Sequence, residues 1–467
     1  MTSRSSAGRK SLRAQKEQLP LFSVKGTYQP SLSTSVQTQQ DTDKRRRLAA
    51  LLESELNFHG ENGNYASHHL HAFAARFPPQ LPRVFIRGLT APGDVVLDPM
   101  MGSGTAVVEA WIEGRRGVGL DIDPLALRLC HVKTRPVQLE GLQEVAQRVV
   151  SKACALAEEK IIAQHLAQRF DERTKAFVNY WFLPATQRQL MALVLAIESV
   201  PEVSARRFLE LTFSSTIITK SGGVTRARDL AHSRPHIDQE KIPKNALEQF
   251  SSRLQKNLTS IAELSVHGTV ATPLAGDARA MPFADGVVDL IVTSPPYANA
   301  LDYMRAHKFS LVWLGKSVGN LSTLRAAYIG SERVKGTQFA ALPERPAGII
   351  RALALLDKSK SEMLAKYFTE MKAVLTEMYR VLRHDSAAVV VVGPSIMRGI
   401  NVQTHHCLAD IAAESGFDVV GVVQRMLDRN KRMMPARFRK TDSMIEQRMH
   451  EEYVIGLWKP SEKGLAV

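Results

Sequence analysis

The sequence predicts an α/β fold whose two halves are separated by a long helical insert. Short apolar runs at Val95–Leu97 and Val288–Val292 have the length and the β-branched content of buried strands. The first run leads into the glycine-rich string Asp98–Thr105 and then into apolar residues at helical spacing. A strand, a glycine turn and a helix N-terminus in this order are typical of a doubly wound sheet that binds a nucleotide-like ligand.

The composition indicates a globular protein with a polyanionic partner. The chain has 467 residues, of which 44% are hydrophobic, a formal net charge of +15 and a pI of about 9.7. This length allows two or three domains, and so basic a chain is typical of proteins that bind nucleic acid or an anionic membrane. No apolar run is long enough to span a membrane. The widely spaced cysteines favour a reducing cytoplasm over disulfides or a zinc cluster; they are Cys130, Cys154 and Cys407.

Four segments follow from the pattern along the chain. Residues 1–46 are rich in Ser, Gln, Thr, Lys and Arg and predict a disordered basic tail. Residues 47–135 hold the first α/β block, and residues 269–467 hold the second. Between them, residues 136–268 carry apolar side chains at helical spacing and predict a helical insert. A smaller insert is expected at about 315–360.

Shorter patterns predict the remaining elements of the two blocks. In the first block we expect a strand at Val118–Leu120, a helix around Phe85 and another helix over Ala106–Ile112. In the second block, β-branched apolar runs predict further strands at Ala387–Val392, Phe417–Val423 and Tyr453–Trp458. Strands that alternate with helices predict the α/β class.

The glycine loop supplies the first candidate ligand-binding residues. A ligand with a carboxylate and an amino group must approach the backbone closely there, so side chains have to be absent, as at Gly102 and Gly104. Ser103 and Thr105 are small and can donate hydrogen bonds, and Asp98 closes the strand ahead of the loop. The backbone N–H groups of the loop and helix would be aimed at the ligand.

Two carboxylates follow the second strand, with different expected roles. Asp121 stands roughly 20 residues after the glycines, where a carboxylate is placed to accept both hydroxyls of a ribose. Asp123 precedes Pro124, which favours an N-cap for the next helix. We therefore expect Asp121 at the ligand, with Asp123 as the alternative.

Together, the glycine loop and the string Thr293–Tyr297 resemble the amino-methyltransferases of DNA, enzymes that use S-adenosylmethionine (AdoMet). The Ser-Pro-Pro-Tyr form is similar to that of the subgroup that methylates N4 of cytosine. The resemblance covers about 70–135 and 269–460 and implies a doubly wound, seven-stranded mixed sheet. It also implies AdoMet as cofactor, double-stranded DNA as partner, the cytoplasm of a bacterium or archaeon as location, and a cognate restriction endonuclease as a further partner.

The resemblance assigns further AdoMet contacts outside the glycine loop. In the family, an Asp at the position of Asp277 accepts a hydrogen bond from the adenine amino group, and a simple turn aspartate is the alternative. Phe73 and Phe77 match the N-terminal cofactor motif, in which an aromatic ring walls the methionine end of AdoMet. Thr293, directly ahead of Ser-Pro-Pro-Tyr, belongs to the same expected cofactor site.

The residues Ser294–Tyr297 suit methyl transfer to an exocyclic amine of a base. The lone pair of such an amine is delocalised into the ring, and acceptors on its N–H protons would localise it. Ser294 Oγ and the Pro295 carbonyl are the candidate acceptors, while Pro295 and Pro296 fix the backbone. Tyr297 offers a face on which a flipped base can stack. In-line transfer from a sulfonium then needs alignment rather than a metal or a nucleophilic side chain.

Two basic stretches are candidates for DNA contact. Lys220–His236 combines glycines with cations in the insert, and residues 428–440 follow an expected strand at the active-site face. Such clusters suit phosphate contacts, and an arginine can also read guanine; a solvated loop is the alternative for each. The candidate DNA-binding residues are Lys220, Arg226, Arg228, Lys431, Arg432, Arg437, Arg439 and Lys440. The histidine pairs at 68–69 and 405–406 lack the spacing of a metal site, so no metal is expected.

Methylation of cytosine N4 in DNA is the expected function. Methylation of adenine N6 in DNA is the nearest alternative, since adenine enzymes more often carry Asp or Asn where this chain has Ser294. RNA base methylation is a third candidate function. A catalytically inactive DNA-binding protein is a fourth, and the intact glycine loop argues against it. We expect residues 136–268 to read the DNA sequence, with 315–360 as the alternative.

Overall fold

The computed structural model describes residues 34–73, 76–135, 141–219, 223–228, 230, 235–262, 269–298, 302–334, 336–427 and 451–461. Within these ranges, no helix is long and apolar enough to cross a membrane.

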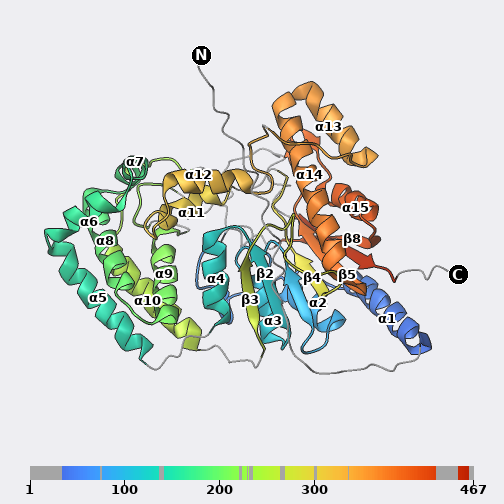
Figure 1. Ribbon diagram of the computed structural model, residues 1–467, viewed down its shortest axis with the longest axis horizontal. Coiled ribbons are helices and arrows are strands. Elements are labelled where there is room, and N and C mark those ends of the chain that lie inside the picture. The colour runs from blue at the N-terminus through green and yellow to red at the C-terminus, as the bar shows by residue number, and fades with distance from the viewer. Residues whose placement is uncertain are drawn as a thin grey trace, which may run out of the picture.

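A seven-stranded mixed sheet forms the centre of the protein (Figure 1). Its strands are β1 (Val95–Asp98), β2 (Arg116–Asp121), β3 (Ala271–Ala275), β4 (Val288–Thr293), β5 (Leu382–Val392), β8 (Asp418–Met426) and β9 (Glu451–Lys459). They lie in the order β3-β2-β1-β4-β5-β9-β8. The strands from β3 to β5 pair in parallel, and β9 pairs antiparallel with both β5 and β8. The expected α/β class and the seven-stranded mixed sheet are confirmed. A separate ribbon joins β6 (Ile396–Met397) to β7 (Ile400–Asn401).

The central strands are buried on both faces, which explains why they are apolar runs rather than alternating patterns. In β1, Val96 packs into the core on one face of the sheet, whereas Leu97 packs into the core on the other. In β4, Leu290 and Val292 share the first core, and Ile291 lies in the second. Successive side chains of a strand point to opposite faces, so helices must cover both.

Two groups of helices supply this cover. The first face carries α1 (Thr34–Glu53), α2 (Gln80–Leu89) and α3 (Thr105–Ile112), and the second carries α14 (Lys358–Val381) and α15 (Thr404–Glu414). On α2, Leu81 and Phe85 are fully buried against the first face, and on α14 Leu375 is fully buried against the second. Helix α13 (Glu344–Leu356) lies outside α14 (Figure 1).

Helix α1 corrects the expected boundary of the N-terminal tail. The helix begins at Thr34, so residues 34–46 are helical rather than part of a disordered tail. Leu48 and Leu52, one helical turn apart, are buried against the sheet, and a Cβ on Gly456 of β9 would lie only 2.5 Å from Leu52 Cδ1. This tertiary contact stabilises the helix. The composition of the polar residues ahead of Leu48 does not reveal the contact.

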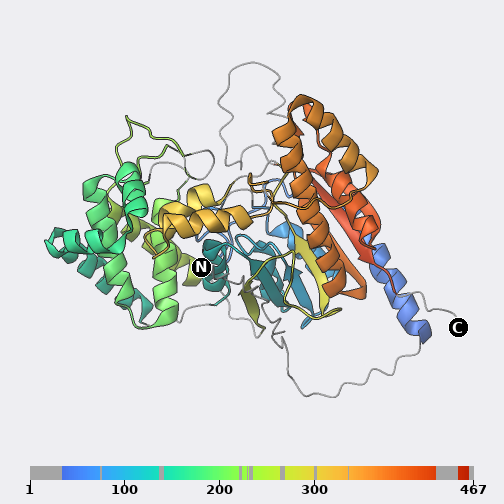
Figure 2. The same ribbon diagram turned by 45° about the horizontal axis from the view of Figure 1, so that its top comes forward.

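The insert is a helical domain with its own apolar core. It contains α5 (Leu142–Glu158), α6 (Ile161–Arg169), α7 (Glu172–Trp181), α8 (Pro184–Glu198), α9 (Val203–Ile217) and α10 (Ala246–Ala262). Figures 1 and 2 both place these helices at the opposite end of the molecule from α13, α14 and α15. Helix α4 (Pro124–Thr134), which follows β2, packs Leu125 and Leu129 into the same core and so joins the insert to the sheet.

The core of the insert also takes in a segment from the second α/β block. Helices α11 (Met304–Leu311) and α12 (Val318–Ala327) follow β4, and Phe309 and Trp313 are fully buried in this core. The rings of Phe182 and Trp313 meet edge to face with centroids 5.4 Å apart. In both views α12 runs from the insert toward the centre of the molecule (Figure 2). The chain that follows Ser294–Tyr297 is therefore anchored in the insert.

Candidate active site

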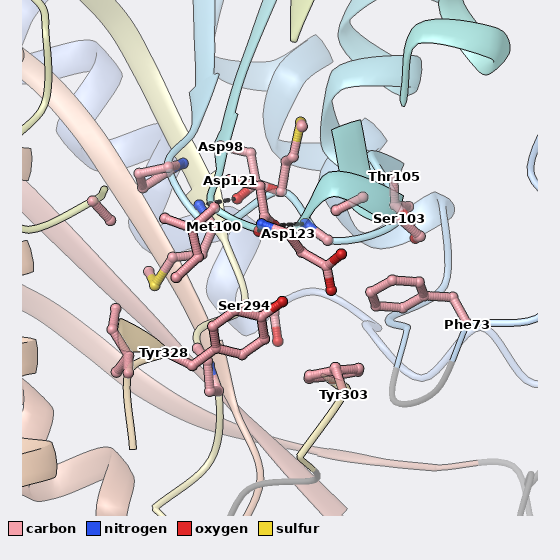
Figure 3. A pocket seen from close by; sticks show the side chains of 18 of the residues that line it. Phe73, Asp98, Met100, Ser103, Thr105, Asp121, Asp123, Ser294, Tyr303 and Tyr328 are labelled. Atoms are coloured by element: carbon pink, nitrogen blue, oxygen red, sulfur yellow. Dashed lines mark hydrogen bonds between the residues drawn. The ribbon is translucent and has the colours of Figure 1, made fainter. Parts of the chain in front are cut away.

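A pocket lies at the carboxyl ends of β1, β2 and β4, where the strand order reverses. In a doubly wound sheet this crevice is the usual ligand site. Figure 3 shows Asp121, Asp123, Phe73, Ser294 and Tyr328 around one common space. The sequence-predicted residues that line it are Phe73, Phe77, Asp98, Gly102, Ser103, Thr105, Asp121, Asp277, Ser294 and Pro296.

Glycine is required at the two positions of the loop for different structural reasons. Gly102 has a φ of +48°, and a Cβ there would lie 3.2 Å from the Phe73 ring at the pocket wall. Gly104 has a φ of +77° and is the N-cap of α3, but its Cβ would meet Cys130 Sγ at 2.9 Å, on helix α4. Gly104 is therefore needed for the left-handed turn and for packing against α4, not to leave room for the ligand as its place in the motif suggested.

A buried lysine holds the glycine loop from behind. Lys133, near the end of α4, donates a hydrogen bond from Nζ to the Ser103 carbonyl oxygen at 2.7 Å. Burial lowers the pKa of Lys133 to about 7, and the nearby charge of Arg76 acts in the same direction. Sequence reasoning missed Lys133, because a lysine thirty residues from its partner carries no local signal.

Asp121 shapes the loop and also borders the pocket. Its Oδ2 accepts from the Gly102 N–H and its Oδ1 from the Asp123 N–H, both at 2.8 Å. A carboxylate has about four acceptor positions, so two remain for a ligand. Burial, with the neighbouring charge of Asp123, raises the pKa of Asp121 to about 6.

Asp123 serves as the N-cap that the sequence predicts, and it also lines the pocket. Its Oδ1 accepts from the Leu125 N–H at 2.7 Å. Its Oδ2 accepts from His307 Nδ1 at 2.5 Å, a contact from α11 that no local pattern predicts. Burial opposes ionisation of Asp123, but the contact with His307 holds its pKa below the usual value.

Asp98 ties the end of β1 to the end of β4. Thr293 Oγ1 donates to Asp98 Oδ1 at 2.7 Å, and the Met100 N–H donates to the same oxygen at 3.2 Å. Thr293 thus supports the site through Asp98 and is not among the side chains that line the pocket. Burial is the main reason that the pKa of Asp98 is raised to about 7.

The variant Asp98→Asn should change how stability depends on pH. The pKa of Asp98 is about 7 in the folded protein, against an ordinary value of 3.8. At a pH between these two values, the folded state therefore binds more protons than the unfolded state. The free energy of unfolding should therefore fall as the pH rises from 4 to 7. Asn keeps the Oδ1 acceptor without this titration, so denaturant titrations of both proteins between pH 5 and 8 should diverge. Parallel pH profiles of the two proteins would contradict the raised pKa of Asp98.

The Ser-Pro-Pro-Tyr string is split between the pocket and its surroundings. Ser294 and Pro296 line the pocket, whereas Pro295 and Tyr297 are not among the lining residues. Tyr297 donates a hydrogen bond from its hydroxyl to Glu452 Oε1 at 3.0 Å. That Tyr297 stacks on a base stays a prediction.

Aromatic rings from three separate segments wall the pocket. Phe73 stacks on Tyr303 with ring centroids 5.1 Å apart, and Tyr328 lies on the other side of Ser294 (Figure 3). Phe77 touches the pocket but is buried in the core with α2. Tyr303 and Tyr328 were not predicted, because neither belongs to a recognisable motif. Tyr328 follows α12, in the smaller insert expected at about 315–360.

Asp277 lies two residues after β3 and is paired with Arg279. Arg279 Nε donates to Asp277 Oδ1 at 2.9 Å, and Arg279 Nη2 donates to Asp277 Oδ2 at 2.7 Å. The same guanidinium reaches Glu370 Oε1 at 2.6 Å and the Ala327 carbonyl oxygen at 2.8 Å. Arg279 therefore links Asp277 to the pocket wall formed by residues 327–329.

Arg226 and Arg228, the predicted DNA-binding residues that the structure describes, are not among the residues that line the pocket. Arg226 Nη1 donates to the Tyr180 carbonyl oxygen at 3.3 Å, which places its loop at the end of α7, and Arg228 is exposed in the same loop. The remaining candidates lie outside the described residues: Lys220, Lys431, Arg432, Arg437, Arg439 and Lys440. Among the described residues, no group of three or more His, Cys, Asp or Glu side chains is arranged to hold a metal ion.

Comparisons with known proteins identify several Type II methyltransferases that are similar to this chain. A family model described as DNA methylase matches residues 2–131. The Type II methyltransferase M.MvaI of Kocuria varians is 22% identical over 403 residues, which cover 79% of this chain and 87% of that protein. M.AvaI of Anabaena variabilis, also a Type II methyltransferase, is 22% identical over 369 residues, covering 69% of this chain and 73% of that protein. M.BsoBI of Geobacillus stearothermophilus is 23% identical, covering 57% and 56% respectively.

Proposed function

We propose, from the premise that this chain belongs to the DNA amino-methyltransferase family, that it methylates the N4 amine of cytosine in a base flipped out of double-stranded DNA. One observation carries the proposal most directly. The hydroxyl-bearing Ser294 and the carboxylate of Asp121 border the same pocket, although 173 positions separate them in the chain. A side chain that would accept from the target amine and a carboxylate that would accept from a ribose thus border one pocket.

The cofactor is S-adenosylmethionine, and the pocket fits it. Asp121 keeps acceptor positions for the ribose hydroxyls, and Asp277 would accept from the adenine amino group. Arg76 also lines the pocket, so its guanidinium is available for the carboxylate of the methionine part. When bound, AdoMet supplies an electrophilic methyl group on a sulfonium.

The protein's own part in the reaction is to prepare the amine and hold it in line. Ser294 Oγ accepts from one N–H of the target amine, which favours a pyramidal nitrogen with a localised lone pair. The rigid Pro295-Pro296 backbone holds this acceptor in place, with the Pro295 carbonyl as the second acceptor. The aromatic side chains at the pocket, with Tyr297, would receive the flipped base and keep water away from it.

DNA would lie across the pocket mouth, between the insert and the far end of the sheet. The exposed Arg228 and its neighbour Arg226 would contact phosphate or guanine from the insert side. Lys431, Arg437 and Lys440, which stand between β8 and β9 in the sequence, would also contact phosphates. We place the enzyme in the cytoplasm, where its DNA substrate would be.

The test is transfer of labelled methyl groups from AdoMet to unmethylated genomic DNA, followed by nucleoside analysis of the product. We expect N4-methylcytosine and no label in a duplex RNA of matched composition. N6-methyladenine as the labelled product would replace cytosine by adenine as the target. Label in the RNA alone would make the chain an RNA methyltransferase, and AdoMet binding without any transfer would make it a DNA-binding protein with an inactive site.

A further inference from the structure

A buried ion pair lies next to the Ser-Pro-Pro-Tyr string, outside the pocket. Arg425 on β8 and Glu452 on β9 are directly opposed in the strand register. Arg425 Nη1 donates to Glu452 Oε2 at 2.7 Å, and the two residues are only 2% and 7% exposed. Arg425 Nε also donates to the Leu56 carbonyl oxygen at 3.0 Å, so the guanidinium is fixed on a second side.

The second oxygen of this glutamate binds the string itself. Glu452 Oε1 accepts from the Tyr297 hydroxyl at 3.0 Å. Because β5 lies between β4 and β9, Tyr297 must cross the carboxyl end of β5 to make this bond. The crossing point is Gly393, directly after β5, where a Cβ would lie 2.7 Å from Tyr297 Cε2 and 2.9 Å from Cζ. The glycine leaves the space in which the ring lies.

Two independent features therefore favour one position of this aromatic side chain. Gly393 leaves the space that the ring occupies, and Glu452 accepts the hydrogen bond of its hydroxyl. Strand pairing alone does not explain the ion pair, because buried ion pairs contribute little net stability compared with apolar residues of similar size. A ring that is already held has less rotational freedom to lose when a ligand arrives.

We propose that Glu452, held by Arg425, is a positioning residue that fixes the Tyr297 ring over Gly393 before the target base enters. This inference rests on the proposed function, in which Tyr297 receives the base. Burial, together with the charge of Glu452, raises the pKa of Tyr297 well above its usual value. The hydroxyl thus stays protonated and keeps donating at neutral pH.

Removing Glu452 alone would leave Arg425 buried and unpaired and could unfold the protein, so the test uses two double variants. Both carry Arg425→Met; one adds Glu452→Gln and the other Glu452→Met. They have similar size and neither contains the buried ion pair, but only Gln offers an acceptor to the Tyr297 hydroxyl. Each double variant is made with Tyr297 and with Tyr297→Phe, which keeps the ring and removes the hydroxyl.

With Tyr297 present, we expect the Gln variant to exceed the Met variant in single-turnover methyl transfer at saturating DNA by about two- to tenfold, the size of one net hydrogen bond. In the Tyr297→Phe background, the two should be equal. Denaturant unfolding should show the same pattern, with a Gln advantage only when the hydroxyl is present. Affinity for AdoMet should be the same in all four proteins, because Glu452 does not line the pocket.

Equal transfer rates for the Gln and Met variants in the Tyr297 background would overturn the proposal, even if unfolding shows a coupling, because the bond would then be structural only. A Gln advantage that persists in the Tyr297→Phe background would overturn it as well. If the unmodified protein transfers no methyl group to DNA, the proposed function fails. The unfolding free energies of the four variants then still decide whether the Tyr297 hydroxyl is bound by the residue at position 452.

Discussion

The variant Ser294→Ala is expected to lower the rate of methyl transfer by about 10- to 1,000-fold, the range for removing one preorganised polar group from an active site. The hydroxyl lines the pocket at the end of β4, where it would accept from the target amine. Its loss leaves the lone pair of that amine delocalised. The contacts assigned to AdoMet are unchanged, so single-turnover rates should fall while the dissociation constant for AdoMet stays the same.

Two matched variants sharpen this prediction. Ser294→Asn keeps a side-chain oxygen that can accept a hydrogen bond and should retain more of the rate than Ser294→Ala. Ser252→Ala, at an exposed position of α10 in the insert, removes a hydroxyl far from the pocket and should leave transfer unchanged. A Ser294→Ala protein that folds and transfers methyl groups at the full rate would rule out Ser294 as the acceptor.

The variant Asp121→Ala is expected to weaken AdoMet binding by about 10- to 100-fold, which corresponds to about 1–3 kcal/mol for a buried polar group left without its partner. Two losses combine in this variant. The ribose hydroxyls would lose their acceptor, and the N–H groups of Gly102 and Asp123 would lose the carboxylate that shapes the glycine loop. Calorimetric titration with AdoMet measures the effect.

The pH dependence of the same titration is a second readout. The pKa of Asp121 is about 6, so its carboxylate is protonated below that pH and accepts fewer hydrogen bonds. Affinity for AdoMet should weaken as the pH falls through 6 in the unmodified protein and change less in Asp121→Ala. Asp285→Ala, whose side chain is 80% exposed, serves as the control and should match the unmodified protein. Unchanged affinity in a folded Asp121→Ala protein would refute the ribose assignment.

The motif correctly predicts a glycine at position 104, but the structural reason for that glycine differs from the predicted one. The motif predicts a glycine at the ligand, and the residue does stand in the loop. However, the close contact that a side chain would make is with Cys130 on α4. A substitution such as Gly104→Val would therefore disturb the loop and its packing rather than occupy the ligand's space directly. Gly102, which faces Phe73, is the glycine that opens toward the pocket.

The sequence by itself determined the parts of this protein whose causes are local. The runs at Val95–Leu97 and Val288–Val292 are buried on both faces, so their apolar composition marks them as central strands. The N-cap at Asp123 depends on the residues directly after it. The glycine loop and the Ser-Pro-Pro-Tyr string are recognisable because their backbone conformation restricts the residues that fit. Each of these depends on neighbours within a few positions.

Only the tertiary structure decided which distant side chains complete the site. Lys133 on α4 holds the glycine loop, and Tyr328 after α12 lines the pocket. His307 on α11 contacts Asp123, and Glu452 on β9 binds Tyr297. Their positions follow from strand order and from the packing of the insert, which place segments side by side without leaving any periodic or local pattern. Such contacts are between residues far apart in the chain, so the sequence around each one carries no sign of its partner.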